Sequence, residues 1–534
     1  MDREAATPAE RGGSVPPEGE PAITEAASAS LSGRTISAAK WRFAATVVQG
    51  GLQFAVGILL ARLLEPDAFG VVAIAWVVLG FAMLVGDLGL GPAVIQRRDL
   101  SERHLRVAFT ASVGMGAGLA LILVALSPFS GVLLRGNELL APVLCVQSLL
   151  FILGGVGGTA RSLLRRQLRF KGLFWTGTLS YVIGYAGVAT VMAFMGYGVW
   201  SLVWGAVMQA LIDNVLVLAL ARHSVRPLVA RRELRELFGF GAGATLNNVV
   251  NFAARNGDNV IVGRWLGALA LGLYGRAYNL MMLPLNYLGV ATHQVLFPAM
   301  AEIQHDRERL GRVYLMSVQM TTLVAAPVMA GMIVAGPHMV TALYGPNWSG
   351  MVIPLQILCV AGIFRSVYHL AGAVTYASGE VYAELRRQAV YTALVVVGGL
   401  AGTSWGVSGV AAGVNLAIVY MYFAMSGLAL RIVARSWTEF GIAQLPGVAV
   451  GAIVAGAALV VRLALEALGL GSGVIFAALL AACALALPAA LYILPTRVRP
   501  ADLFARVSGS FGRLPPALKH ALERVLRIPV TVLP

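Results

Sequence analysis

The feature that most constrains this chain is a series of apolar segments, each long enough to cross a bilayer as a helix. A bilayer core needs about 20 apolar residues per helix, and about fourteen segments reach that length. They lie at roughly 43–63, 69–95, 107–127, 138–160, 174–195, 199–221, 238–264, 269–299, 313–335, 350–377, 388–404, 407–430, 441–462 and 472–494. Hydrophobic residues make up 58% of the chain and charged residues only 12%, which is too little charge for the surface of a soluble protein. The sequence predicts an all-α polytopic membrane protein.

The basic residues alternate from loop to loop. Of the 40 Lys and Arg residues, all but seven lie in the two termini or in every second loop. The exceptions are Arg62, Arg135, Arg255, Arg264, Arg276, Arg365 and Arg462. Cytoplasmic loops of membrane proteins carry this positive excess, so we expect both termini in the cytoplasm. Basic residues in short loops beside apolar spans do not form a nucleic-acid-binding stripe, and no nucleic acid partner is predicted.

An internal repeat divides the chain. Ala61-Arg62-Leu63-Leu64 through Phe69-Gly70 matches Gly263-Arg264-Trp265-Leu266 through Leu271-Gly272, 202 positions later. Because each repeat holds six spans, an even number, the two halves share one orientation and are expected to be related by a pseudo-twofold axis along the membrane normal. The predicted units are a disordered cytoplasmic tail (1–37), a six-helix bundle (38–222), a basic cytoplasmic linker (223–237), a second six-helix bundle (238–435), two additional helices (436–495) and a basic cytoplasmic tail (496–534).

A polar stripe in the seventh segment is the sharpest candidate site. Its residues recur at helical spacing and share one face: Asn247, Asn251, Arg255, Asp258 and Asn259. Gln49 and Gln53 occupy the positions of the first repeat that are equivalent to Asn251 and Arg255, so the first segment carries the same stripe without charge. Ionisable residues in mid-membrane usually face a cavity or a partner, and two such helices would line one shared central cavity.

Two further segments add polar groups to this predicted cavity. The eighth carries Arg276, Asn279, Asn286 and His293 on one arc, and the tenth carries Arg365, His369 and Tyr376 on one face. A cation-lined cavity in an apolar bundle favours an anionic amphipathic substrate, and guanidinium suits phosphate.

Each of these positions also has a structural interpretation. Arg255 and Asp258 would neutralise each other at i and i+3, and the Asn and Gln side chains would form interhelical hydrogen bonds. Arg276 would extend to the interface, and His369 would be a packed neutral histidine. Asp87 would meet a basic loop.

Signals of catalysis are absent from the sequence, so no enzyme activity is predicted. The chain has no phosphate-binding GxxxxGKS loop and no paired carboxylates at an outer face. Its three cysteines, Cys145, Cys359 and Cys483, lie inside apolar segments without CxxC spacing, which argues against a disulfide framework or zinc. No cofactor or metal is expected.

Several motifs of this chain are typical of a known family of membrane proteins. The longest is Asp258-Asn259-Val260-Ile261-Val262-Gly263-Arg264-Trp265-Leu266-Gly267 followed by Leu271-Gly272-Leu273-Tyr274-Gly275-Arg276-Ala277-Tyr278. Supporting motifs are Lys40-Trp41, Ala61-Arg62-Leu63-Leu64-Glu65-Pro66 through Phe69-Gly70, Gly89-Leu90 with Ile95-Gln96-Arg97, and Leu343-Tyr344-Gly345-Pro346-Asn347-Trp348. Together these motifs resemble the polysaccharide transporter family, the Wzx-type oligosaccharide flippases of the MOP superfamily, and the resemblance covers about residues 38–435.

The resemblance implies a MOP/MATE-like fold, with two six-helix bundles around a cationic cavity that works by alternating access. The substrate would be an undecaprenyl-pyrophosphate-linked oligosaccharide, moved from the cytoplasmic to the periplasmic leaflet of the bacterial inner membrane for exopolysaccharide, capsule or O-antigen synthesis. Arg255, Arg276 and Arg365 would meet pyrophosphate or acidic sugars, and Asp258 with Asn259 would help a coupling cation. The protein would be a monomer, and its partners would be membrane lipids, a polysaccharide polymerase and a chain-length regulator. The alternatives are a MATE-like multidrug exporter, which cationic side chains disfavour, and a non-transporting scaffold of a polysaccharide-synthesis complex.

Overall fold

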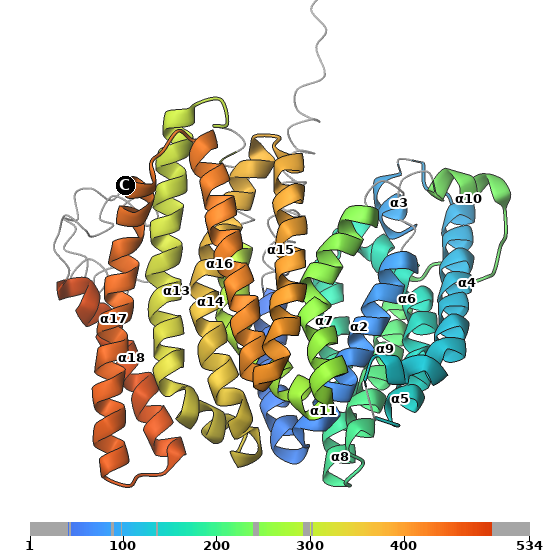
Figure 1. The fold of residues 1–534 in the computed structure, drawn as a ribbon. Helices are drawn as coiled ribbons and strands as arrows, with labels where there is room; N and C mark the ends of the chain where they lie inside the picture. The colour runs from blue at the N-terminus through green and yellow to red at the C-terminus, as the bar shows by residue number, and fades with distance from the viewer. Residues whose placement is uncertain are drawn as a thin grey trace, which may run out of the picture.

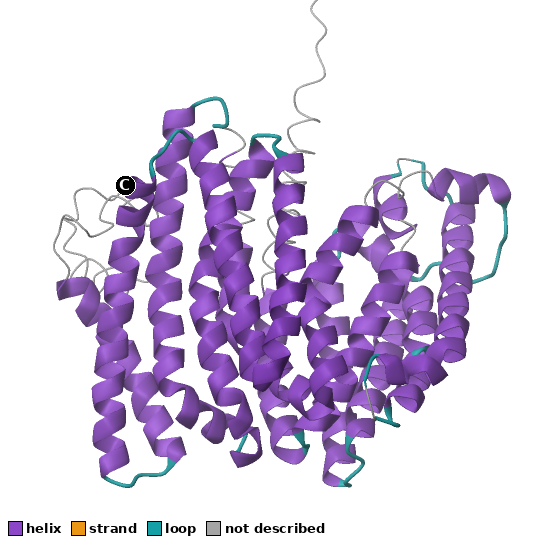
Figure 2. Ribbon diagram, viewed as in Figure 1, coloured by secondary structure: helices purple, strands orange, loops and turns teal. Residues whose placement is uncertain are grey.

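The described part of the chain is a bundle of long helices without a strand (Figures 1 and 2). The computed structural model describes residue 41 and residues 44–493, apart from 87–89, 98, 135–136, 239–244, 292–299 and 301–302. The predicted tails 1–37 and 496–534, together with Asp87, Arg135 and His293, lie outside the described residues. A purely helical structure satisfies every backbone polar group within the segment, as the hydrocarbon core of a bilayer requires.

The first half begins with the helix Ala44–Leu63. It continues through α2 (Pro66–Gly86), α3 (Leu90–Gln96), α4 (Glu102–Leu126), α5 (Leu140–Gln147), α6 (Leu149–Arg166), α7 (Phe170–Ser180), α8 (Ala189–Phe194) and α9 (Val199–Ala221). Between α7 and α8 the chain forms one continuous rod through the π-helical segment Tyr181–Val188. A short amphipathic helix, α10 (Arg231–Phe238), then leads to the second half.

The second half starts with α11 (Thr245–Ala291), a helix bent at Gly267. Gly267 has φ 87°, a value that glycine adopts without steric cost and other residues rarely reach. The bend separates a first arm (245–266) from a second arm (268–291), which correspond to the seventh and eighth predicted segments. The remaining helices are α13 (Arg307–Leu343), α14 (Val352–Ala377), α15 (Val381–Gly402), α16 (Gly406–Ile432), α17 (Trp437–Ala467) and α18 (Ser472–Ile493).

The number of helices is consistent with the predicted number of spans. Eleven helices of the described residues are long and apolar enough to cross a membrane. One of them, Tyr382–Ile432, contains 51 residues and folds back between α15 and α16 at the short turn Thr403–Trp405, so it supplies two crossings. The charged arms of α11 supply two more, which brings the total to fourteen and confirms the predicted fold class.

The two halves meet where the repeated motifs pack against each other. A Cβ built on Gly70 would lie 1.9 Å from the carbonyl oxygen of Ala268, and one on Gly272 would lie 1.8 Å from that of Pro66. The offset of 202 relates Gly70 to Gly272 and Pro66 to Ala268, so the contact is reciprocal, as a twofold relation requires. This interface brings α2 against α11 along their lengths.

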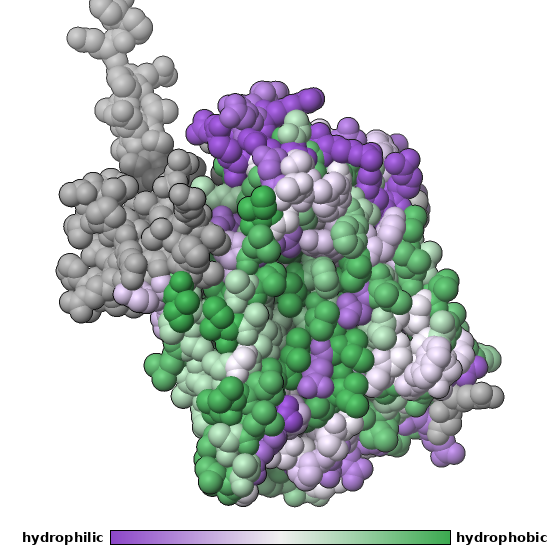
Figure 3. All heavy atoms as spheres, turned by 60° about the vertical axis from the view of Figure 1, so that its left-hand side comes forward, coloured by the Kyte–Doolittle hydropathy of each residue, from purple (hydrophilic) through white to green (hydrophobic). Residues whose placement is uncertain are grey.

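The outer surface suits a lipid environment. Helices α17 and α18 pack on α13 at one edge of the bundle (Figure 1). On that side, apolar side chains cover most of the face and hydrophilic ones gather at the end where α13 begins (Figure 3). Large apolar residues there are exposed, including Val460 at 68% and Leu485 at 73%. A surface on which exposed apolar side chains predominate is typical of a membrane-facing region.

Candidate functional site

A cavity of about 450 Å³ lies in the second half and carries much of the predicted chemistry. We call it the arginine cavity, after Arg255 of α11 and Arg365 of α14. His369 and Tyr376 of α14 also line it, and α15 contributes Glu384 and Gln388. The structure therefore brings Arg255, Arg365 and His369 to one place from two separate helices.

Arg365 is the most deeply placed cation of this cavity. Its side chain is only 9% exposed, and its Nε is buried without a hydrogen-bond partner among the described residues. The guanidinium lies 5.7 Å from the centre of the Tyr278 ring, close enough for a cation–π contact. An unsatisfied buried donor is costly, so an acceptor that reached this Nε–H would lower the free energy of the site.

Asp258 has a different environment from its neighbour Arg255. Its Oδ2 accepts a hydrogen bond of 2.7 Å from the Tyr274 hydroxyl, and its Oδ1 accepts one of 2.9 Å from the backbone N–H of Asn259. Both Asp258 and Tyr274 are buried. Among the described residues, the hydrogen-bond donors to the Asp258 carboxylate are thus Tyr274 and the Asn259 backbone, and Arg255 forms no ion pair with it. The bond to Tyr274 instead links the two arms of α11 across the bend at Gly267.

A second cavity, of about 530 Å³, lies between the halves. We call it the amide cavity, because Gln49 and Gln53 of the Ala44–Leu63 helix face Asn279 and Asn286 of α11 across it. Arg276 also lines it, with its guanidinium 4.1 Å from the centre of the Phe69 ring in the first half. Gln49 Nε2 donates a 3.4 Å hydrogen bond to Thr178 Oγ1.

The predicted site residues are thus divided between two cavities. The sequence predicted one shared cavity, but Arg276 lies with the glutamines and Arg255 lies with Arg365, because α11 bends at Gly267 and its arms face different neighbours. Asn247 and Asn251 belong to α11, but their side chains lie outside what the structure describes.

Sequence reasoning missed Glu384 as a cavity residue. The apolar segment appeared to begin at 388, which left Glu384 in a loop, but α15 begins at Val381 and carries Glu384 into the wall of the arginine cavity. A signal was available, since Glu384 and Gln388 stand four residues apart on the same helical face. Tyr344 also lines the amide cavity, whereas the sequence identified it only as part of the motif Leu343–Trp348 and not as a site residue.

The halves are tied together at the end away from the basic loops. Arg62 Nε donates a 2.8 Å hydrogen bond to the carbonyl of Leu343, and another nitrogen of Arg62 donates to that of Ala342. Trp348 is fully buried, and its Nε1 donates a 2.7 Å hydrogen bond to the carbonyl of Ala61. We call these bonds the outer lock, since they join the first hairpin of one half to the α13–α14 turn of the other.

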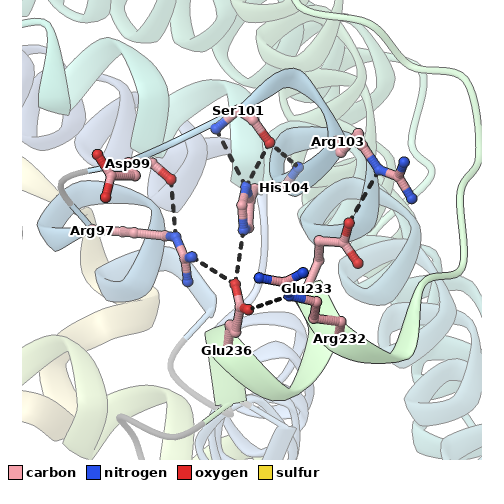
Figure 4. A network of polar contacts seen from close by, with 8 residues as sticks. All are labelled: Arg97, Asp99, Ser101, Arg103, His104, Arg232, Glu233 and Glu236. Carbon is pink, nitrogen blue, oxygen red and sulfur yellow. Dashed lines mark hydrogen bonds and ion pairs between the residues drawn. The ribbon is translucent and has the colours of Figure 1, made fainter.

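At the basic end, α10 is anchored to the first half (Figure 4). Glu236 accepts from Arg97 at 2.6 Å and lies 3.2 Å from His104, while Glu233 lies 3.1 Å from Arg103. Hydrogen bonds, first from His104 and then from Arg232 and Arg97, lower the pKa of Glu236 to about 2. The linker helix α10 is therefore held on the α3–α4 loop and the first turn of α4, in part by a Glu236 carboxylate that stays ionised at physiological pH.

Another mid-membrane carboxylate is neutralised within the first half. Asp213 of α9 accepts a 2.6 Å bond from Arg161 of α6, which also donates to Asn214. An ion pair with this hydrogen bonding is a structural solution to a buried charge. Among the described residues, no group of three His, Cys, Asp or Glu side chains is arranged to hold a metal ion.

The family assignment follows from a sequence match. Residues 59–353 match the profile of a family described as polysaccharide biosynthesis protein, which is more than half of the 534 residues. This chain belongs to that family. The assignment confirms the resemblance found in the motifs around Arg62 and Arg264, both of which lie within the matched range.

Relatives in this family come from several bacteria. The chain is 28% identical to the lipopolysaccharide biosynthesis protein WzxC of Escherichia coli over 389 residues, which span 71% of this chain and 78% of the relative. It is 28% identical to the teichuronic acid biosynthesis protein TuaB of Bacillus subtilis, over 66% of this chain and 73% of the relative. It is 30% identical to the succinoglycan biosynthesis transport protein ExoT of Rhizobium meliloti, over 56% of this chain and 60% of the relative.

Solved structures show the same fold. The lipid II flippase MurJ in an inward closed conformation aligns with a TM-score of 0.63 at 13% identity, covering 86% of this chain and 98% of that one. An inward-facing MATE multidrug transporter of the MOP superfamily aligns with a TM-score of 0.57 at 17% identity, covering 72% and 94%. This polysaccharide biosynthesis family member is a multi-pass membrane protein with the MOP fold, and the prediction that it is not an enzyme agrees with its family and fold.

Proposed function

We propose that this protein is a flippase that moves an undecaprenyl-pyrophosphate-linked oligosaccharide from the cytoplasmic to the periplasmic leaflet, for exopolysaccharide, capsule or O-antigen synthesis. The observation that carries the proposal is the buried guanidinium of Arg365, whose Nε has no hydrogen-bond partner in the part of the chain that the structure describes and which shares a cavity with Arg255. The family places the protein in polysaccharide biosynthesis, and the name of ExoT includes transport.

The cavity chemistry favours a phosphate-bearing substrate over a cationic drug. Guanidinium donates several N–H bonds in a fork that matches phosphate oxygens, and a buried site strengthens each of them. A cation would instead meet like charges, a repulsion that costs affinity and selects against it. In this proposal Arg255 and Arg365 bind the pyrophosphate, while Arg276, Gln49, Gln53 and Asn279 bind sugars in the amide cavity.

The proposed cycle is alternating access between the two halves. The outer lock closes the end that lacks basic loops, and the positive-inside rule assigns the opposite end to the cytoplasm. We propose that substrate loads from the cytoplasmic side of the inner membrane and that the outer lock breaks to release it. Two bundles (38–222 and 238–435) would move about α10, with 436–495 as an addition and both termini cytoplasmic.

The proposal also covers partners and coupling. A polymerase and a chain-length regulator would receive the flipped repeat unit from a monomeric flippase. Asp258 and Asn259 remain candidates for a coupling cation, although the Asp258 carboxylate already accepts from Tyr274 and from the Asn259 backbone. A coupling role would require that this carboxylate leave Tyr274 in another state.

The test is complementation of a strain that lacks its own copy of the gene. We expect Arg255→Ala and Arg365→Ala to lower surface polysaccharide at least about tenfold, since a charge-assisted hydrogen bond contributes roughly 1.5–3 kcal/mol. The matched control is Arg386→Ala on α15, an exposed arginine of the same helical region. Unchanged polysaccharide at equal membrane levels of the variants would contradict the cationic-cavity mechanism and favour a scaffold.

A further inference from the structure

Glu384 is an acidic side chain in a cavity whose other charged side chains are the cations Arg255 and Arg365. It lines the arginine cavity together with Arg255 and Arg365. Its Oε1 lies 3.9 Å from the position that a Cβ on Gly372 would take, so the carboxyl group reaches across from α15 to α14.

The carboxyl group is only partly satisfied by its surroundings. Tyr376 forms a hydrogen bond to it, but Oε2 is buried and has no hydrogen-bond partner among the described residues. No described arginine lies within ion-pairing distance of it; Arg387, three positions later, donates instead to the carbonyls of Ala424 and Ala383. Glu384 therefore neither neutralises the cavity arginines nor is held by them.

Such a carboxylate opposes the binding of any anion in the same cavity. A sphere of about 450 Å³ is roughly 10 Å across. At that separation one negative charge weakens the binding of a monovalent anion by about twofold in water, and by about fifteenfold at an effective dielectric constant of about 20. Protonation of Glu384 removes this repulsion, and by linkage a bound anion favours the protonated form.

We propose that Glu384 makes anion binding in the arginine cavity proton-linked, so that the cavity binds its anion together with one proton taken from solvent onto the Glu384 carboxylate. This inference rests on the proposed function, because it takes a phosphate-bearing or acidic-sugar group as the anion. Loading of the flippase would then respond to cytoplasmic pH, and binding would tighten as pH falls.

A test must distinguish the effect of Glu384 from the effects of other charged or titratable side chains in the cavity. Several charged or titratable side chains face the cavity from α11, α14 and α15: Arg255, Arg365, Tyr368, His369, Tyr376 and Tyr391. Helix α16 contributes only the uncharged Met421 and Met425. Among these, His369 is the one imidazole, and an imidazolium at this position would also strengthen anion binding.

The experiment measures binding to the full-length protein in lipid nanodiscs at pH 5.5 and pH 8. The probe is a 1,2-alkanediol bis-sulfate, whose charge is constant over this range, with inorganic pyrophosphate as a second anion. Because the bis-sulfate carries two negative charges, the factor for a monovalent anion is squared, and we expect the wild-type protein to bind the bis-sulfate at least about fourfold more weakly at pH 8 than at pH 5.5. Glu384→Gln should bind tightly at both pH values, since glutamine is neutral and fills nearly the same space.

Matched variants decide between the explanations. Glu380→Gln, an exposed residue one turn earlier, should behave as the wild type does, and His369→Gln should keep most of the pH dependence. An unchanged pH ratio in Glu384→Gln, or equal wild-type affinity at both pH values, would overturn the inference and leave the flippase proposal intact. Bis-sulfate binding that survives Arg365→Ala, or no wild-type binding at either pH, would overturn the anion site itself.

Discussion

Gly70 in the first half packs against the backbone carbonyl of Ala268 in the second, at a distance that leaves no room for a side chain. Gly272 makes the equivalent contact with Pro66, so the same small residue serves both sides of one pseudo-twofold interface. Because backbone meets backbone there, neither side can relax by rotating a side chain.

The first prediction concerns this interface. Gly70→Val and Gly272→Val should each lower the thermal unfolding temperature and the yield of monodisperse protein, since overpacking costs about 1–3 kcal/mol or more when backbone must shift. Fluorescence-detected size exclusion after heating measures the effect. Gly118→Val on α4 is the control, because nothing lies within 4 Å of a Cβ at that position. Equal stability of all three variants would contradict the close reciprocal packing.

The second prediction concerns the outer lock. Arg62→Ala removes two hydrogen bonds to the α13–α14 turn, and Trp348→Phe removes the bond to the Ala61 carbonyl. Each bond contributes about 1 kcal/mol, so both variants should shift the population toward an outward-open state. In a background without Cys145, Cys359 and Cys483, a cysteine placed at Gln53 should then react faster with an impermeant maleimide added from the periplasmic side. Unaltered labelling would mean that other contacts hold the outer end closed.

The third prediction concerns the anchor of α10. Because the pKa of Glu236 is lowered to about 2, its contribution is present in full above about pH 4.5 and is lost only as the pH falls toward 2. Amide hydrogen exchange of α10, corrected for intrinsic rates, should therefore show the same protection at pH 7 and at pH 5. Glu236→Gln should exchange faster at both pH values, while Glu308→Gln on α13 should leave α10 unaffected. Protection that falls between pH 7 and pH 5 in the wild type would contradict an ionised anchor.

The fourth prediction concerns the bond between Asp258 and Tyr274. Tyr274→Phe leaves a buried carboxylate without its side-chain donor and should destabilise the protein by roughly 1–3 kcal/mol. Asp258→Asn keeps an acceptor for Tyr274 and should be closer to the wild type in thermal unfolding. If Asp258 only joins the two arms of α11, Asp258→Asn should retain polysaccharide export; loss of export at normal stability would instead support the coupling role.

The membrane-spanning helices were predictable because they depend on local properties. Twenty apolar residues in a row have few alternatives to a membrane helix, whereas the orientation that loop charge indicates stays a prediction. The repeat containing Arg62 and Arg264 was also visible in the sequence, and it led correctly to two halves that meet through equivalent residues. The types of residue in the candidate site followed from the cost of burying charge.

The sequence by itself determined the number of spans, the pseudo-twofold relation and the residues Arg255, Arg276 and Arg365 as the exceptional charges. Only the tertiary structure decided how these residues are grouped. Helical spacing shows which side chains share a face, but the bend at Gly267 turns the two arms of α11 toward different partners, so Arg276 faces Gln49 and Gln53 while Arg255 joins Arg365. The start of α15 likewise decided whether Glu384 belongs to a loop or to a cavity. Both outcomes depend on packing between helices distant in sequence, which periodicity along one helix does not contain.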